Sequence, residues 1–319
     1  MTRRRRWLLV ISACACAGLG VAAAGARRPA EEPDDQARVR CATRVSLALT
    51  GRSPSEELLA AADPQSMARA LMATPEFADY FARFVNASFN PEPGMSPAED
   101  ASYYLARKII EEGRPWAELF NGPYRVRPVD IDGKASAEVI DDPDGLGYFR
   151  SPVWMRRYAG NEEDGYRLTA AYRILQNTVG LSVDGVDNVP DADLSATGRM
   201  APACRGCHYD SWFALDKVAK ILSRRQGEGD QMTFIPPDEG PQEILGGITI
   251  GNDAELVNAL VESDDFRFRV CRMSFQFLYG RDETTCEGTL FDACMAAFAE
   301  SGEIQSALEV IVTDPGFCE

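Results

Sequence analysis

Apolar side chains recur at helical spacing through much of the chain, and the alternation typical of strands is scarce. Within residues 74–89, aromatic side chains stand at spacings of three, one and three, which places them on one face of a helix. Helix-start signals, each a capping residue followed by proline, begin at Ser53, Asp63 and Thr74. These patterns predict a mainly α protein with a helical N-terminal region at residues 41–125.

Three further amphipathic segments end the chain, at residues 264–280, 287–300 and 303–314. Each segment carries an apolar stripe along one side. Short connections separate the segments, and such connections favour antiparallel neighbours. The pattern therefore predicts a C-terminal three-helix module at residues 263–319.

Two stretches between the helical regions are rich in glycine, proline and aspartate, at residues 122–150 and 224–252. These residue types favour turns. The aspartates do not match the spacing of an EF-hand calcium loop, so solvated turns are the better interpretation. Residues 126–200 are therefore predicted to be an irregular, loop-rich connection, in which helical pattern resumes only around residues 167–176.

The chain is acidic, and it has enough hydrophobic residues to form a core. Hydrophobic residues make up 45% of the 319 positions, and the formal net charge is −16. An acidic surface repels phosphate, which argues against nucleic acid as a partner. The same surface attracts basic proteins, so we expect any redox partner to be basic.

The first 26 residues have the anatomy of an export signal. Arginines at positions 3–6 form a positively charged start, and residues 7–24 form an apolar stretch. The small residues around Ala26 fit cleavage after that residue, which would leave a charged linker at residues 27–40. The signal predicts a periplasmic or cell-envelope protein.

Two other outcomes of this signal would leave the protein attached to a membrane. Residues 11–14 resemble a lipobox, which would make Cys14 the site of lipoprotein processing. The apolar stretch could instead stay as an uncleaved anchor helix, although its length is at the short end for a span. Outside this stretch we expect no segment to cross a membrane.

A C-x-x-C-H motif occupies residues 204–208, and its histidine is the only one in the chain. In such a motif, two thiols add across the two vinyl groups of haem, and the adjacent imidazole reaches the iron. The export signal agrees with this interpretation, because haem is attached to c-type cytochromes outside the cytoplasm. We therefore expect one covalent haem c in a haem-binding segment at residues 201–262. Cys204 and Cys207 would attach it, and His208 would be the proximal iron ligand.

The motif has three other interpretations. A thioredoxin-like redox pair needs a βαβ setting, which the pattern lacks. Half of a zinc site would need a second pair of ligands, but the chain has no second C-x-x-C and no other histidine. A plain disulfide in a tight turn also fits the spacing.

The sequence leaves the sixth ligand of the iron open. Methionine is the usual partner of histidine in such cytochromes, and Met232 lies in a loop 24 residues after His208. A vacant or water-filled position fits the sequence equally well. Met200 stands just before the motif, whereas Met273 and Met295 fall on apolar helix faces and are expected to fill the core. Three aromatic residues are expected to pack beside the haem: Tyr209, Trp212 and Phe213.

Seven cysteines follow the signal, and an oxidising compartment favours disulfides among them. If the first two C-terminal helices pack antiparallel, Cys271 and Cys294 are nearly level on facing helices. The third helix would return Cys318 towards Cys286. We therefore predict the pairs Cys271–Cys294 and Cys286–Cys318, with Cys41 unpaired or joined to another chain. The alternatives are Cys286–Cys294 with Cys271–Cys318, and buried free thiols.

Residues 203–208, followed by Trp-Phe-Ala-Leu-Asp at 212–216, resemble the haem segment of the planctomycete-type cytochromes. Residues 44–54, 113–124 and 277–317 resemble other parts of the same family, which consists of large, exported, poorly characterised proteins. The resemblance implies haem attachment at the motif and redox activity, with no established substrate. The chain lacks the proline-glycine pair that often follows the motif in this family, so its local haem environment differs.

Three functions fit these observations. An electron carrier agrees with a single haem and with the lack of an evident substrate motif. A haem-based ligand sensor or enzyme would need an open distal site, and the single histidine removes any distal histidine for acid–base help. A structural envelope protein would need no haem. We expect single-electron transfer rather than catalysis.

Overall fold

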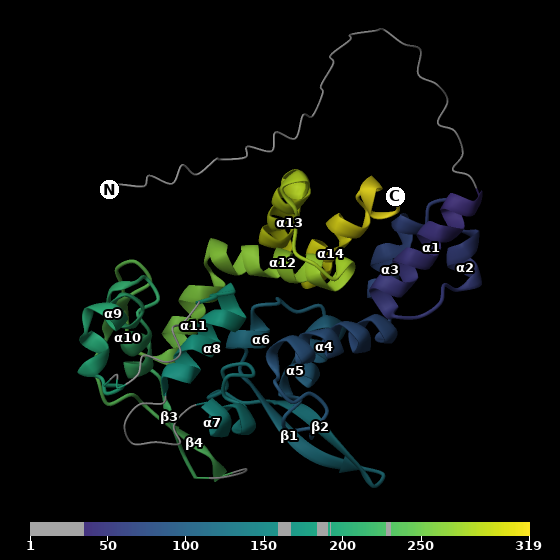
Figure 1. Ribbon diagram of the computed structural model, residues 1–319. Coiled ribbons are helices and arrows are strands. Elements are labelled where there is room, and N and C mark those ends of the chain that lie inside the picture. Colours follow the sequence, from purple (N-terminus) through teal and green to yellow (C-terminus); the bar gives the residue numbers. More distant parts are fainter. Residues whose placement is uncertain (1–34, 159–166, 184–190, 192, 228–230) are drawn as a thin grey trace, which may run out of the picture. The chain divides into compact units, whose positions relative to one another are not determined.

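Helices dominate the computed structural model (Figure 1). The structure describes residues 35–158, 167–183, 191, 193–227 and 231–319. Fourteen α-helices lie within these residues, so the predicted mainly α class is confirmed. The predicted export signal with Cys14 lies outside the described residues, as does most of the linker. None of the helices in the described part has the length and apolarity that crossing a membrane requires.

The N-terminal region is a set of helices whose starts follow their capping residues. Its elements are α1 (Asp35–Thr50), α2 (Glu56–Ala60), η1 (Pro64–Met67), α3 (Ala68–Met72), α4 (Pro75–Phe89), α5 (Ala101–Glu111) and α6 (Glu118–Asn121). Thr74 caps α4 by accepting a hydrogen bond from Phe77 N. Ser55 caps α2 by accepting one from Leu58 N, so this helix begins two residues after the predicted start at Ser53.

Three helices close the chain at the three predicted segments. They are α12 (Asp264–Tyr279), α13 (Gly288–Ser301) and α14 (Ile304–Val312), with η5 (Thr285–Glu287) before α13 and η6 (Pro315–Phe317) after α14. An aromatic cluster joins α12 to the N-terminal region. The ring of Phe81 in α4 is fully buried, and its centroid lies 4.8 Å from that of Phe277 and 5.8 Å from that of Trp116.

The region expected to be irregular contains a β-hairpin, so that prediction is wrong. Strands β1 (Tyr124–Ile131) and β2 (Lys134–Asp141) pair antiparallel along their whole length. Asp132 and Gly133 form the turn with φ angles of 53° and 76°, which is the left-handed backbone that a two-residue hairpin loop requires. The Asp-Gly pair that suggested a loop is therefore the signal for the hairpin.

Short elements lie between the hairpin and the C-terminal helices. They are α7 (Pro152–Tyr158), α8 (Arg167–Val179), η2 (Gly198–Met200), α9 (Pro202–Arg205), the π-helical turn η3 (Gly206–Asp210), α10 (Leu215–Lys220), β3 (Arg224–Gln226), β4 (Thr233–Ile235), β5 (Gln242–Ile244), β6 (Ile248–Ile250) and α11 (Asp253–Val261). Two small hairpins, β3–β4 and β5–β6, stand where loops were expected. Helices α10 and α11 both pack on α8, and these contacts hold the predicted haem-binding segment against the core.

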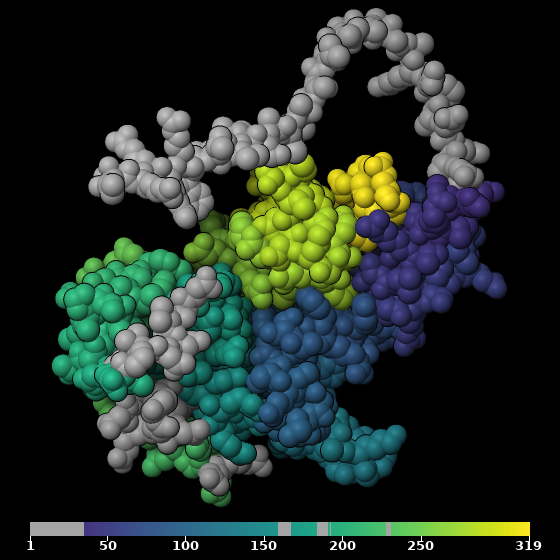
Figure 2. Space-filling model, viewed as in Figure 1, coloured from purple at the N-terminus to yellow at the C-terminus, as the bar shows by residue number. Residues whose placement is uncertain are grey.

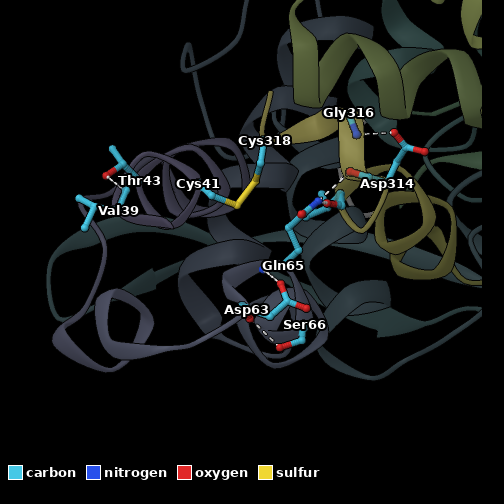
Figure 3. The surroundings of a disulfide bond; sticks show 10 residues. Val39, Cys41, Thr43, Asp63, Gln65, Ser66, Asp314, Gly316 and Cys318 are labelled. Atoms are coloured by element: carbon cyan, nitrogen blue, oxygen red, sulfur yellow. Dashed lines mark hydrogen bonds between the residues drawn. A yellow bond between two sulfur atoms is a disulfide. The ribbon is translucent and has the colours of Figure 1, made fainter. Parts of the chain in front are cut away.

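The disulfides agree with one predicted pair and overturn the other. Cys271 is joined to Cys294, with 6.0 Å between their Cα atoms, as the facing helices predict. Cys318 is joined to Cys41 of α1, with 4.9 Å between their Cα atoms, so the predicted Cys286–Cys318 pair and the unpaired Cys41 are both wrong (Figure 3). Cys286 is exposed and forms no disulfide.

The turn after α14 is the reason for the different pairing. Gln65 of η1 donates hydrogen bonds to the carbonyl oxygens of Val312, at 2.5 Å, and Asp314, at 2.7 Å. These bonds tie the end of α14 to the N-terminal helices, as Figure 3 shows. After Asp314, the ring of Phe317 packs against Tyr279 at the end of α12, with 5.4 Å between centroids, and Cys318 reaches Cys41 of α1 rather than Cys286.

Candidate haem-attachment site

The C-x-x-C-H motif lies on one short helical stretch that changes its winding in the middle. Cys204 belongs to α9, and Cys207 and His208 belong to the π-helical turn η3 that follows directly. The backbone N–H of Ser211 donates to the carbonyl oxygen of Gly206 at 2.8 Å, which closes the wider π turn. Single π turns inside helices are frequent at functional sites.

Both motif thiols are free and accessible. Cys207 is exposed, Cys204 is partly exposed, and neither forms a disulfide. A side chain at Gly206, between them, would meet no atom within 4 Å, so this side of the turn opens to solvent. In the space-filling view the teal-green stretch of the chain that includes the motif lies at the surface (Figure 2). The two thiols are therefore available to a haem, and the plain-disulfide interpretation of the motif is not what the structure contains.

The other two interpretations of the motif find no support in the surrounding structure. All three sheets in the described part are two-stranded antiparallel hairpins, whereas a thioredoxin-like pair belongs to a βαβ unit. Within the described residues, no group of three or more histidine, cysteine, aspartate or glutamate side chains is placed to hold a metal ion. A haem attached through two thioethers needs only one imidazole as its proximal ligand.

His208 is held by a buried carboxylate. Its Nδ1 atom lies 2.7 Å from Oδ2 of Asp216 in the first turn of α10. The Asp216 side chain is only 6% exposed, whereas that of His208 is 23% exposed. With Nδ1 donating to the carboxylate, the proton sits on that nitrogen, and Nε2 is left with its lone pair free to bind a metal.

Arg199 completes this arrangement from the other side of the motif. Its Nη2 atom donates to Oδ1 of Asp216 at 2.7 Å, and its Nε atom donates to Oδ2 at 3.0 Å. The Arg199 side chain is 13% exposed, so the pair is largely removed from water. Arg199 lies in η2 before the motif and Asp216 in α10 after it, so the pair brackets the attachment turn.

The charges of this pair are stabilised by their contacts. Burial alone would raise the pKa of Asp216, but the hydrogen bonds from Arg199 and His208 outweigh burial and hold that pKa below its usual value. The hydrogen bond to Asp216 raises the pKa of Arg199. Asp216 is therefore an ionised acceptor facing the histidine ring.

The other predicted site residues are distributed differently. Met232 is buried and lines a cavity of about 460 Å³ together with Arg150 and Phe234, and the motif residues are not part of that lining. Its role as distal ligand stays a prediction. Met200 in η2 is 53% exposed, directly before the motif. Met273 is buried in the core as expected, and Met295 is partly buried and packs against the core.

The aromatic residues that follow the motif differ in exposure and contacts. The Trp212 side chain is 42% exposed, and its ring meets that of Phe213 edge-on with 5.5 Å between centroids. Phe213 is partly buried against the core. The Tyr209 hydroxyl donates to the carbonyl oxygen of Ala196 at 2.9 Å, which ties the turn to the segment before it. An exposed aromatic ring so soon after the motif in the chain suits packing against the apolar face of a haem.

Arg199 and Asp216 were not singled out as site residues from the sequence. Both are common residue types, and they stand 17 positions apart. A buried acidic residue one helix after a C-x-x-C-H motif is the signal that could have identified Asp216, but its burial is known only from the fold.

The chain was compared with protein-family models, with curated proteins and with solved structures, and none of these comparisons gave a significant match. The resemblance to planctomycete-type cytochromes therefore stays a prediction that depends on the residues of this chain.

Proposed function

We propose that the protein is an exported c-type cytochrome that carries one covalent haem and transfers single electrons. One observation carries the proposal: two free, accessible thiols share a helical turn with a histidine whose Nδ1 is fixed by a buried carboxylate. This combination provides two attachment points and one oriented iron ligand within five consecutive residues. It has no evident purpose in a purely structural envelope protein.

Each residue of the motif has a defined task in this proposal. The thiols of Cys204 and Cys207 would add across the haem vinyl groups, each forming one C–S bond while its proton passes to the neighbouring carbon. His208 would offer Nε2 to the iron. The haem supplies reversible one-electron chemistry when it is bound. The protein's part is to hold the ring in place and to set its surroundings.

The exposure of the site supports electron transfer to another protein. Cys207 is exposed and Trp212 is 42% exposed, so a haem edge attached here would be near the surface. The chain carries a formal net charge of −16, which would attract a basic partner to the protein at low salt. We therefore propose a basic redox protein as the partner, met outside the cytoplasm.

The finer architecture belongs to the same proposal. Residues 201–262 would form a cytochrome c-like haem segment, and residues 263–319 a three-helix module, as the resemblance to planctomycete-type cytochromes implies. Contacts among α12, α13 and α14, together with the Cys271–Cys294 disulfide, support the module. The packing of α10 and α11 on α8 supports a haem segment held against the rest of the chain.

A second candidate is a haem protein with an open distal position, acting as a ligand sensor or enzyme. The position of Met232 favours it, because Met232 lines a cavity to which the motif residues do not contribute. Carbon monoxide separates the two candidates: an iron with methionine as sixth ligand binds it slowly, whereas an open iron binds it at once and shifts its absorption spectrum.

Haem staining after denaturing electrophoresis tests the central proposal on protein matured with c-type assembly machinery. The wild type should stain, and the double variant Cys204→Ser/Cys207→Ser should not, because no thioether can form. Cys286→Ser is the matched control, since it removes an exposed free thiol elsewhere and should leave staining unchanged. An unstained wild type, or staining that survives loss of both motif thiols, would contradict the proposal.

A further inference from the structure

We propose that Asp216, held by Arg199, is a positioning residue that lowers the reduction potential of the haem and makes this protein a low-potential electron carrier. The inference rests on the proposed function, because it concerns a haem bound through His208. Its basis is the buried chain of contacts Arg199–Asp216–His208, which joins the elements on either side of the attachment turn.

The partner of His208 Nδ1 determines how strongly Nε2 donates to the iron. A ligating histidine commonly donates its second ring N–H to a carbonyl, a water or a carboxylate. A carboxylate is the strongest acceptor of the three because it is charged. It draws the ring proton towards itself and makes Nε2 more basic. A more basic ligand stabilises ferric iron more than ferrous iron, which lowers the reduction potential.

Burial makes this contact stronger than a surface contact would be. The Asp216 side chain is 6% exposed, so little water competes for its oxygens. The 2.7 Å separation from Nδ1 is short for a nitrogen–oxygen hydrogen bond, as charge-assisted bonds are. In a medium of low dielectric constant the same charges interact more strongly than in water.

Arg199 keeps the carboxylate charged and fixes its orientation. A single buried carboxylate would be costly, and two hydrogen bonds from a guanidinium offset that cost. Arg199 also donates to the carbonyl oxygen of Leu194, which anchors the arginine to the segment before the motif. The ring of His208 is therefore held by a carboxylate that cannot rotate freely.

A nearby ion pair provides a matched control. Asp210 ends the π-helical turn η3 and pairs with Arg205 at 2.9 Å, but both side chains are more than half exposed, at 54% and 59%. Asp210→Asn and Asp216→Asn each remove one negative charge close to the motif. Only the second replaces the charged acceptor of His208 with a neutral amide oxygen. The difference between the two variants therefore separates the effect of a charged acceptor on the ring from the general effect of a nearby charge.

The test is the midpoint potential of purified holoprotein, measured by spectroelectrochemistry. We expect Asp216→Asn to favour the ferrous form at least tenfold, which is a rise of about 59 mV for one electron. Asp210→Asn should produce a clearly smaller rise. Equal potentials for the two variants, or no rise in Asp216→Asn, would overturn the inference while the haem stain of the wild type still supports the proposed function.

A second variant keeps the inference testable if Asp216→Asn does not mature. Arg199→Lys retains a positive charge but loses the two-pronged contact with the carboxylate. This variant should retain haem. Its midpoint potential should lie above that of the wild type and below the potential expected when the carboxylate is lost. An unchanged potential in this variant, with haem attached, would mean that the Arg199–Asp216 pair does not set the potential. A wild type without haem would refute the proposed function itself.

Discussion

Reduction of the Cys41–Cys318 disulfide should destabilise the protein more than reduction of Cys271–Cys294. The first bond joins residues 277 positions apart, and the second joins residues 23 positions apart. A crosslink restricts the unfolded chain, and a longer loop loses more conformational freedom when it is closed. The bond between the two ends of the described chain should therefore contribute more to the free energy of unfolding.

The loop lengths give the size of the effect. In the chain-entropy treatment, closing a loop of this longer length contributes about 5.6 kcal/mol at 25 °C, and the shorter loop about 3.4 kcal/mol. The difference of about 2 kcal/mol depends only on the logarithm of the ratio of the two loop lengths.

Two variants isolate the bonds without comparing different side chains. In Cys271→Ala/Cys294→Ala, urea denaturation with and without reductant measures the contribution of Cys41–Cys318 alone. In Cys41→Ala/Cys318→Ala, the same pair of measurements gives the contribution of Cys271–Cys294. The loss on reduction should be larger in the first variant. Equal losses, or a larger loss in the second, would refute the reasoning from loop length.

Two further predictions concern the core and one helix start. Phe81→Ala should lower the free energy of unfolding by about 3–5 kcal/mol in urea denaturation, because its ring is fully buried in the aromatic cluster; a loss below about 1 kcal/mol would contradict that packing. The hydrogen bonds from Arg281 and from Thr284 N lower the pKa of Glu287 to about 2. A carboxyl with a lowered pKa stabilises the fold above its unfolded pKa, so Glu287→Gln should cost about 1 kcal/mol at pH 7. This cost should shrink as the pH falls from about 4.5 to about 2, and a cost that does not change with pH would exclude the ion pair as its source.

Features that depend on neighbours in the sequence could be predicted, and features that depend on distant residues could not. The cap at Thr74 and the three C-terminal helices follow from local patterns, because a helix satisfies its hydrogen bonds within itself. The Cys271–Cys294 pair could be predicted as well, because a short connection joins the two helices and places them side by side. Cys41–Cys318 was not, because its cysteines meet only after the whole chain has folded.

The hairpin and the site show two other limits. Asp132-Gly133 was an available signal, but the strands beside it lack a clean alternation: only part of each strand is buried, and β1 contains a proline. At the site, the C-x-x-C-H motif was enough to single out Cys204 and His208 as candidate site residues without any knowledge of the fold. Asp216 acquires its position only because α10 packs on α8 and turns its first residues towards the motif.

The cysteines of the described chain fall into two groups, those joined in disulfides and those with free thiols. Cys41, Cys271 and Cys294 are buried, and Cys318 is partly buried; the fold joins them in two pairs. Cys204 and Cys207 remain accessible and unpaired on a turn that is anchored by hydrogen bonds rather than by a disulfide. Cys271 and Cys294 are both fully buried, so thiols outside the core cannot reach them. The fold therefore leaves Cys204 and Cys207 accessible and unpaired, with Cys286 as the third free cysteine of the described chain. The two cysteines that the proposed haem requires can then react with it from the surface, without disruption of the core.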